Sequence, residues 1–216
     1  MTAKKQQPLW WEEFYGESCF MDAVGFPDEA KTAEEVRFII DALELPAGAR
    51  ILDVCCGYGR HALQLARRGF FVVGLDYSRE YLRRASVAAL KNALPVRFVR
   101  ADMRAIPFMG QFDAVLSLLT SIGFFERESE DEGVFVQMAQ AAKPQAKLFI
   151  DVANHDWVIR DYAPTHQKDW LETPDGSIFL MSHDVDAQRY RIRRRVIRIR
   201  NGERCESGFD IRMYNY

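Results

Sequence analysis

The chain has 216 residues, of which 48% are hydrophobic, and its formal net charge is −2. This length suits one domain with at most a small appendage, and the near-neutral charge points to no particular charged partner. We find no secretory leader, no apolar run that could span a bilayer, and no disulfide or zinc spacing among the four cysteines, so we expect a soluble cytoplasmic protein without a metal site.

Residues 1–30 form an irregular, aromatic segment in the sequence pattern. The aromatic side chains between Trp10 and Phe20 have no regular period, which predicts a lid rather than a core element. An amphipathic helix is expected at 31–45. Thr32 and Glu35 have the spacing of a capping box at its start.

Between residues 50 and 152, short apolar runs alternate with helical patterns. The expected strands are 50–55, 70–75, 96–100, 112–118 and 147–152, and the helical patterns lie at 61–69, 79–93 and 130–143. Strands that alternate with helices predict an α/β fold, a Rossmann-like, doubly wound, mostly parallel sheet with helices on both faces. We assign residues 31–155 to this domain.

The alternation stops after about residue 155. Strand-like segments follow at about 168–173, 177–186, 189–200 and 205–214, with turn signals at 173–176 and at Asn201-Gly202. This pattern predicts an antiparallel meander over residues 156–216, which we expect to cover the site of a second substrate.

The meander contains an arginine run at 189–200. Arg189, Arg191, Arg193 and Arg195 would lie on one face of a strand. Cross-strand ion pairs with nearby acids explain this run without nucleic acid, and we do not expect a nucleic-acid partner. The acids are Asp184, Asp186, Glu203, Glu206 and Asp210.

An acid stands at or after the end of each of the first three strands of the parallel sheet. Asp53 precedes the turn Gly57-Tyr58-Gly59, and Asp76 and Asp102 end the next two strands. Ligands of such sheets bind beyond the carboxyl ends of the strands. A carboxylate here would repel a dinucleotide pyrophosphate, so the ligand should lack phosphate and carry a cation. S-adenosylmethionine fits both requirements.

The stretch LDVCCGYGRH…GLDYS…ADMRAIPF…FDAVLSLLTSIGFF resembles class I S-adenosylmethionine-dependent methyltransferases. The resemblance is greatest to the small-molecule branch that includes sugar amine N-methyltransferases. It implies that Asp53 orients the methionine ammonium, that Gly57 and Gly59 let the backbone pass close to the methionine, and that Asp76 accepts both ribose hydroxyls.

The same resemblance implies the adenine site. Tyr77 and Met103 would sandwich the adenine, Asp102 would accept from its exocyclic amine, and the backbone near Leu118 would make a second ammonium contact. Many relatives have glycine at the position of Cys55. We expect Cys55 and its neighbour Cys56 to pack under the turn.

The methyl acceptor is expected beside the end of the fourth strand, at Thr120, Ser121, Phe124 and Phe125. An amine acceptor needs little beyond the loss of a proton, whereas a hydroxyl acceptor needs a base. We expect an amine rather than a hydroxyl.

The polar groups available for catalysis or positioning follow strand five or lie near the two chain ends. His155 is the best-placed base among them. They are Tyr15, Asn154, His155 and Tyr214.

Two other functions stay open. The chain could be an RNA or protein methyltransferase that uses the arginine strand, or a cofactor-binding module without catalysis.

Relatives usually follow the meander with a helix and two strands that complete the parallel sheet, and this sequence stops before them. We therefore expect five parallel strands with an open edge. Either a second copy covers this edge, as in a homodimer, or the polypeptide is part of a longer protein.

Overall fold

The computed structural model describes residues 10–16, 28–165 and 168–215. The chain divides into two compact units. One, the parallel unit, holds residues 26–153. The other, the meander unit, holds residues 154–216 together with the N-terminal segment up to residue 25. No helix among the described residues is both long and apolar enough to cross a bilayer.

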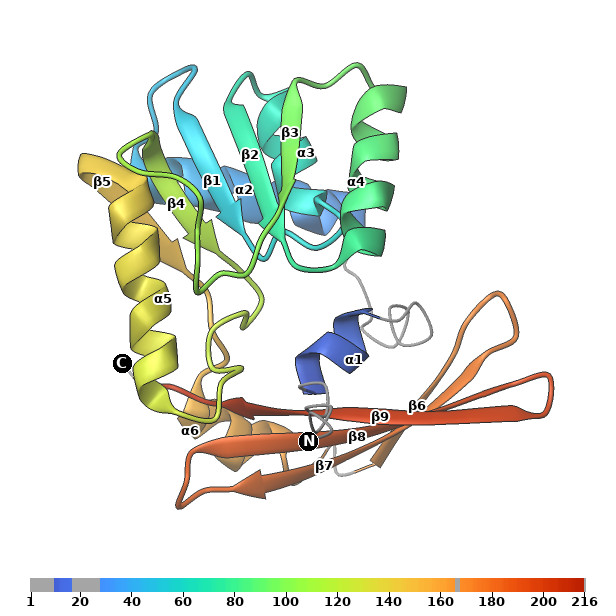
Figure 1. Cartoon of the computed structure of the whole chain (residues 1–216). Coiled ribbons are helices and arrows are strands. Elements are labelled where there is room, and N and C mark those ends of the chain that lie inside the picture. The colour runs from blue at the N-terminus through green and yellow to red at the C-terminus, as the bar shows by residue number, and fades with distance from the viewer. Residues whose placement is uncertain (1–9, 17–27, 166–167, 216) are drawn as a thin grey trace, which may run out of the picture. The chain divides into compact units, whose positions relative to one another are not determined.

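The parallel unit alternates strands and helices, as the sequence predicts (Figure 1). All neighbouring strand pairs run parallel, in the order β3-β2-β1-β4-β5. The predicted five-stranded Rossmann-like sheet is therefore confirmed. Its elements are α2 (Glu29–Leu43), β1 (Arg50–Val54), α3 (Arg60–Arg67), β2 (Phe71–Asp76), α4 (Arg79–Lys91), β3 (Val96–Arg100), β4 (Phe112–Ser117), α5 (Glu128–Ala141) and β5 (Ala142–Ile150).

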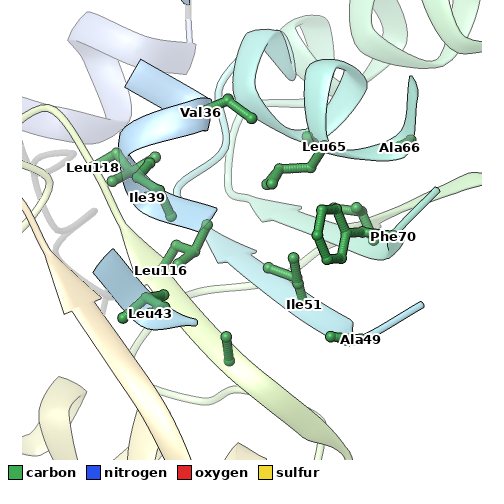
Figure 2. Close-up of a cluster of buried hydrophobic side chains, with 13 residues drawn as sticks. Val36, Ile39, Leu43, Ala49, Ile51, Leu65, Ala66, Phe70, Leu116 and Leu118 are labelled. Carbon is green, nitrogen blue, oxygen red and sulfur yellow. The ribbon is translucent and has the colours of Figure 1, made fainter. Parts of the chain in front are cut away.

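One face of this sheet carries the main hydrophobic core (Figure 2). Val36 and Ile39 of α2 and Leu65 of α3 pack there against Ile51 and Leu116 of the central strands. Figure 1 shows α5 on the opposite face from α2. Because β1 and β4 are covered on both faces, their sequences are apolar runs instead of alternating patterns. Since these strands are parallel, the carboxyl ends of β1, β2 and β4 lie together at one edge of the sheet, and the residues at this edge are buried.

Two glycines make a close approach possible between the turn after β1 and strand β3. A Cβ atom on Gly74 would lie 2.7 Å from the Phe98 ring and 2.8 Å from Cys56 Sγ. A Cβ atom on Gly59 would lie 2.9 Å from the same ring, and Gly59 also has a left-handed φ of 80°. The Phe98 ring thus packs where any side chain on these two residues would clash.

The meander unit contains a separate four-stranded antiparallel sheet in the order β6-β7-β8-β9. The predicted Asn201-Gly202 turn joins β8 to β9, and both residues have left-handed φ values, 50° and 80°. Its elements are α1 (Trp10–Gly16), α6 (His155–Trp157), the π-helical turn η2 (Val158–Tyr162), β6 (Lys168–Glu172), β7 (Ile178–Asp186), β8 (Arg191–Arg200) and β9 (Glu203–Arg212).

The expectation of an irregular segment before residue 30 is wrong for residues 10–16, which form helix α1. Phe14 is 1% exposed and packs in one cluster with Phe179 of β7 and Val196 of β8. The helix has only seven residues, too few for a periodic signal, and tertiary packing rather than propensity holds it. The remainder of the proposed lid, residues 17–20, lies outside the described residues.

The predicted capping box at Thr32 is also wrong. Helix α2 begins at Glu29, and Asp28 is its N-cap, accepting from the backbone N–H of Lys31. The Thr32 hydroxyl donates to the Asp28 carbonyl inside the first turn, and Glu35 pairs with Arg60 of α3 instead. Asp28 satisfies the same requirement four residues earlier.

The arginine strand has the predicted cross-strand ion pairs. Arg193 lies opposite both Asp184 and Asp210, with N–O distances of 3.9 and 3.1 Å. Arg191 pairs with Asp210, and Arg195 pairs with Glu206, each at 2.5 Å. Carboxylates therefore account for the exposed face of β8.

The closing strands that proteins of the resembling family usually have do not occur in the described part of the parallel sheet. β5 pairs with β4 alone, and the strands after residue 155 build their own sheet. Association of a second copy along β5 stays a prediction.

The close packing around Phe98 predicts the effect of a single methyl group. Gly74→Ala should lower the free energy of unfolding by about 1–3 kcal/mol, because neither the ring nor Cys56 can move without disturbing the core. Urea unfolding measures this change. Gly133→Ala in α5 is the matched control: its Cβ meets nothing within 4 Å, so it should stabilise by about 0.5–1 kcal/mol. An unchanged urea midpoint for Gly74→Ala would contradict the close approach.

Candidate functional site

The turn between β1 and α3 is fixed to the end of β2. The backbone N–H of Cys56 donates to the Leu75 carbonyl at 2.9 Å, and that of Gly57 donates to Asp76 Oδ2 at 2.8 Å. Gly57 and Gly59 both have left-handed φ values, 56° and 80°. The two predicted glycines therefore shape a turn that runs back over the neighbouring strand.

Cys55 departs from the expectation that both cysteines pack under the turn. Its φ is 60°, a conformation that favours glycine, and its Sγ lies 3.5 Å from the Sδ of Met103. Burial raises the pKa of the Cys55 thiol well above its ordinary value, and the nearby charges of Asp76, Asp53 and Asp102 add to this effect. Cys55 is thus a protonated thiol beside the three predicted acids. Cys56 is buried, as expected.

Asp53 is a buried carboxylate that is only partly satisfied. The side chain is 2% exposed, and its Oδ2 has no hydrogen-bond partner among the described residues. Burial, followed by the charge of Asp76, raises the pKa of Asp53 to about 7, while the Arg60 charge and the Ala62 backbone N–H act in the opposite direction. An added cation beside Oδ2 would favour its ionised form.

Arg60, at the first position of α3, is a buried cation whose hydrogen-bonding groups are also only partly satisfied. Its Nη1 donates to Thr32 Oγ1 at 2.8 Å and to Glu35 Oε2 at 2.5 Å. Its Nε and Nη2 are buried and have no partner in the described part of the chain. Buried donors without acceptors are rare because each costs about 1–3 kcal/mol.

Asp53 and Arg60 together present a carboxylate oxygen and guanidinium N–H groups that the protein leaves unsatisfied. An amino-acid zwitterion has the complementary groups, an ammonium and a carboxylate. The residues present therefore fit the methionine part of S-adenosylmethionine. Sequence reasoning missed Arg60, whose place one residue after Gly59 at a helix start was the available signal.

Asp76 ends β2 and is 8% exposed. Its two oxygens accept from the backbone N–H groups of Gly57 and Ser78, each at 2.8 Å. Burial raises the pKa of Asp76, and these backbone donors oppose the rise. Each carboxylate oxygen has a second acceptor position, so Asp76 can still accept from two ligand hydroxyls.

The predicted adenine residues follow β2 and β3. Tyr77 is half-buried beneath the guanidinium of Arg100, which lies 5.1 Å from its ring centroid, and Met103 is buried. Asp102 forms a salt bridge with Arg104 at 2.7 Å. An amine bound by Asp102 would share that carboxylate with Arg104.

The segment after β4 holds two successive left-handed residues. Leu119 and Thr120 both have a φ of 57°. Asp151 stabilises this backbone: its Oδ2 accepts from the Leu119 N–H at 3.1 Å, and its carbonyl accepts from the Thr120 N–H at 2.9 Å. Non-glycine residues in this conformation cost energy and cluster at functional sites. Sequence reasoning did not identify Asp151.

The other residues predicted near the acceptor are mostly buried. Ser121 donates to the carbonyl of Leu118 at 2.8 Å, so both lie in one tight turn. Phe125 is buried with Arg104 4.7 Å from its centroid, and Phe124 is half-buried. The structure thus places these residues and Thr120 in one short segment at the end of β4.

His61 in α3 is neutral. It is buried, and its Nε2 lies 3.0 Å from Glu35 Oε2. Burial and the neighbouring Arg60 charge lower the pKa of His61 to about 4, despite the opposing effect of Glu35. His61 therefore acts as a hydrogen-bonded packing residue.

The predicted catalytic residues lie in the meander unit. His155 Nδ1 lies 2.9 Å from Asp156 Oδ1, and its ring stacks on Tyr190 with centroids 4.3 Å apart. Its Nε2 is buried without a partner among the described residues. The backbone N–H of His155 donates to the Tyr214 carbonyl at 3.4 Å, which brings these two residues together.

Two further residues proposed from the sequence have structural contacts. Asn154 caps α6 by accepting from the backbone N–H of Trp157 at 2.9 Å. Tyr15 of α1 belongs to a different cluster, with Trp10 and Phe14.

Part of this chain is similar in sequence to known methyltransferases. Residues 51–145 match a family model described as "Methyltransferase domain". The glycine/sarcosine N-methyltransferase of Halorhodospira halochloris is 29% identical over 64% of this chain and 52% of its own length. The ubiquinone biosynthesis O-methyltransferase of Escherichia coli O127:H6 is 30% identical over 64% of this chain and 55% of its own length. The chain thus spans about half the length of these relatives.

Solved structures share the fold. CalS10, an amino pentose methyltransferase from Micromonospora echinaspora whose structure contains bound S-adenosylmethionine, superimposes with a TM-score of 0.65. The match covers 99% of this chain and 86% of CalS10 at 22% sequence identity. At this identity the likeness concerns the fold.

The high pKa of Asp53 predicts a pH-dependent cost in the protein without ligand. The folded-state pKa of about 7 lies above the ordinary value of 3.8, so the contribution of Asp53 to stability falls as the pH rises between these values. Asp53→Asn removes the charge. Its free energy of unfolding relative to the native protein should therefore rise between pH 5 and pH 8, on the order of 1–3 kcal/mol. Urea unfolding at both pH values measures this difference.

Asp113→Asn provides a control of opposite sign. A hydrogen bond from Lys143 lowers the pKa of Asp113, so its carboxylate stabilises the fold in the ionised form. This variant should gain nothing as the pH rises. A stability difference for Asp53→Asn that is the same at pH 5 and pH 8 would contradict the proposed burial cost.

Proposed function

We propose that this chain transfers a methyl group from S-adenosylmethionine to an amine of a small molecule, since residues 51–145 match a family model described as a methyltransferase domain. The observation that carries this proposal is the pair of unsatisfied buried charges, Asp53 and Arg60, at the turn after β1. When bound, the cofactor supplies a methyl group activated by a sulfonium.

The proposed cofactor site uses the carboxyl ends of three strands. Asp53 would hold the methionine ammonium, with the backbone near Leu118 as a second contact, and Arg60 would hold the carboxylate. Gly57 and Gly59 would allow the backbone to approach. Together these groups fix the amino-acid part of the cofactor.

The nucleoside part would lie next along the sheet edge. Asp76 would accept from the ribose hydroxyls with the acceptor positions that Gly57 and Ser78 do not use. Tyr77 and Met103 would flank the adenine, and Asp102 would accept from its amine. The thiol of Cys55, close to Met103, would line the same wall.

The proposed acceptor segment is Thr120, Ser121, Phe124 and Phe125. Its apolar rings would exclude water, and its rigid backbone, held by Asp151, would align the acceptor for direct displacement. The support for an amine comes from the names of the relatives: one acts on glycine or sarcosine nitrogen, and CalS10 acts on an amino pentose. Tyr15 and Tyr214 stay candidates for positioning.

A hydroxyl acceptor is a second candidate, and one observation favours it. The Nε2 of His155 is buried and unpartnered among the described residues while Nδ1 pairs with Asp156. This arrangement suits a neutral ring with its lone pair on Nε2, the form of a general base. The Escherichia coli relative is named an O-methyltransferase.

The test of the proposed function is release of S-adenosylhomocysteine from S-adenosylmethionine with a panel of small amines and alcohols. Release that depends on an amine supports the proposal. Cofactor binding without release for any acceptor would instead support a non-catalytic module. Release with RNA or peptide alone would support the alternative that uses the arginine strand.

Asp76→Ala tests the cofactor site. The variant should bind S-adenosylhomocysteine about 10- to 100-fold more weakly, since two hydroxyls lose a charged acceptor. Calorimetric titration measures the affinity, and Asp113→Asn, remote from the strand ends, should bind as the native protein does. An unchanged affinity in Asp76→Ala would remove Asp76 from the site.

His155→Gln separates the two acceptor classes. If a hydroxyl is methylated with His155 as base, kcat should fall about 10²- to 10⁴-fold. For an amine acceptor the change in kcat should be below about tenfold. Steady-state rates with an amine and with an alcohol measure both effects, and a large loss with an amine would overturn our preference.

A further inference from the structure

Strand β8 separates its arginines into two faces with different charge neighbours. The exposed-face residues Arg191, Arg193 and Arg195 each pair with a carboxylate across the sheet. Arg194 points to the other face, where β8 contributes Val196 to the buried aromatic cluster. No carboxylate lies within ion-pair distance of Arg194 among the described residues.

The neighbours of Arg194 are neutral acceptors and an aromatic ring. Its Nε donates to Nε2 of His183, and its Nη2 donates to the Tyr162 hydroxyl at 2.8 Å. Its guanidinium carbon lies 5.1 Å from the ring centroid of Phe209. For His183 to accept through Nε2, its ring proton must lie on Nδ1.

This environment holds Arg194 rigidly without neutralising it. A guanidinium has five N–H donors, and the two bonds to His183 and Tyr162 use two of them. The residue is half-buried, so its remaining donors have limited access to water. A partly desolvated cation with spare donors in a fixed geometry suits an anion that accepts from the guanidinium fork.

One aromatic ring lies against this cation, and another packs on its hydrogen-bond partner Tyr162. Phe209 lies beneath it, and the ring of Trp157 lies 5.5 Å from that of Tyr162 with an interplanar angle of 36°. Trp157 is 49% exposed, which is unusual for so large an apolar ring. A ligand with an anionic group and an apolar or planar body would contact both kinds of surface.

We propose that Arg194, Tyr162 and His183 form an anion-binding site that takes a carboxylate or phosphate group of a small organic molecule. The assignment of this molecule as the methyl acceptor rests on the proposed function. The anion site itself depends only on contacts within the meander unit. The acceptor would thus be an anionic amine, recognised through its charge by Arg194.

Binding of benzoate tests the site independently of catalysis. Arginine Nε–Hε signals in a ¹⁵N NMR titration should include one that shifts saturably with benzoate and that is missing in Arg194→Gln. The affinity for benzoate should fall about 10- to 100-fold in Arg194→Gln, the usual loss for a hydrogen-bonded charge pair. Benzamide, which has the same ring without the charge, should not bind measurably.

Arg195→Gln is the matched control, since it makes the same change at the next residue on the paired face and should bind benzoate as the native protein does. Arg194→Lys keeps the charge but loses the fork, and should bind with intermediate affinity. Equal benzoate affinity in Arg194→Gln and the native protein would overturn the proposal. Loss of binding in Arg198→Gln, with Arg194→Gln unaffected, would also overturn it.

Titration with phenyl phosphate beside benzoate shows which anion the site prefers, because the tighter ligand occupies more of the site when the two are present at equal concentration. A methyl-transfer assay then addresses the acceptor. Arg194→Gln should raise the KM for anionic amines about tenfold or more, leave neutral amines unchanged and leave S-adenosylhomocysteine affinity intact. If no amine is methylated at all, the proposed function fails, while the benzoate titration still decides the anion site.

Discussion

The buried carboxylate of Asp53 is the constraint on which the proposed site depends. A charge at the end of the central strand is costly, and the protein leaves one of its oxygens unsatisfied among the described residues. The surrounding sheet edge is correspondingly rigid, with the turn tied to β2 and the next segment held by Asp151. Such a site gains most from a ligand that brings its own cation. The stability of the empty protein and its affinity for the ligand are therefore opposed at this one residue.

Sequence patterns predicted the fold well because the signals were local. Apolar runs between glycine turns gave the five parallel strands, and Asn201-Gly202 gave a hairpin, since both residues tolerate left-handed φ. The acids Asp53, Asp76 and Asp102 were found because strand ends meet at one edge of a parallel sheet. Alternate residues of a strand lie on the same face, so the ion pairs of the arginine strand could be predicted from the positions of its arginines in the sequence.

Other features depended on contacts between distant residues and could not be read locally. The seven-residue helix α1 is held by Phe14 against β7 and β8, and its sequence is too short to show a period. Glu35 matched a capping motif, but its carboxylate serves Arg60, 25 residues away. Asp151 accepts a hydrogen bond from the backbone N–H of Leu119, which lies 32 residues earlier in the sequence. The sequence showed that Cys55 stands where many relatives have glycine, but only the structure shows that its φ is left-handed.

The attachment of the glycine turn to β2 has a consequence for how a ligand enters. The amides of Cys56 and Gly57 are bonded to Leu75 and Asp76, and the Phe98 ring fills the space above Gly59 and Gly74. The turn cannot swing open unless the central sheet separates, which places its amides in the slowest class of hydrogen exchange. A ligand must then enter and leave the site without movement of this turn. The turn would therefore keep one shape through each round of ligand binding and release.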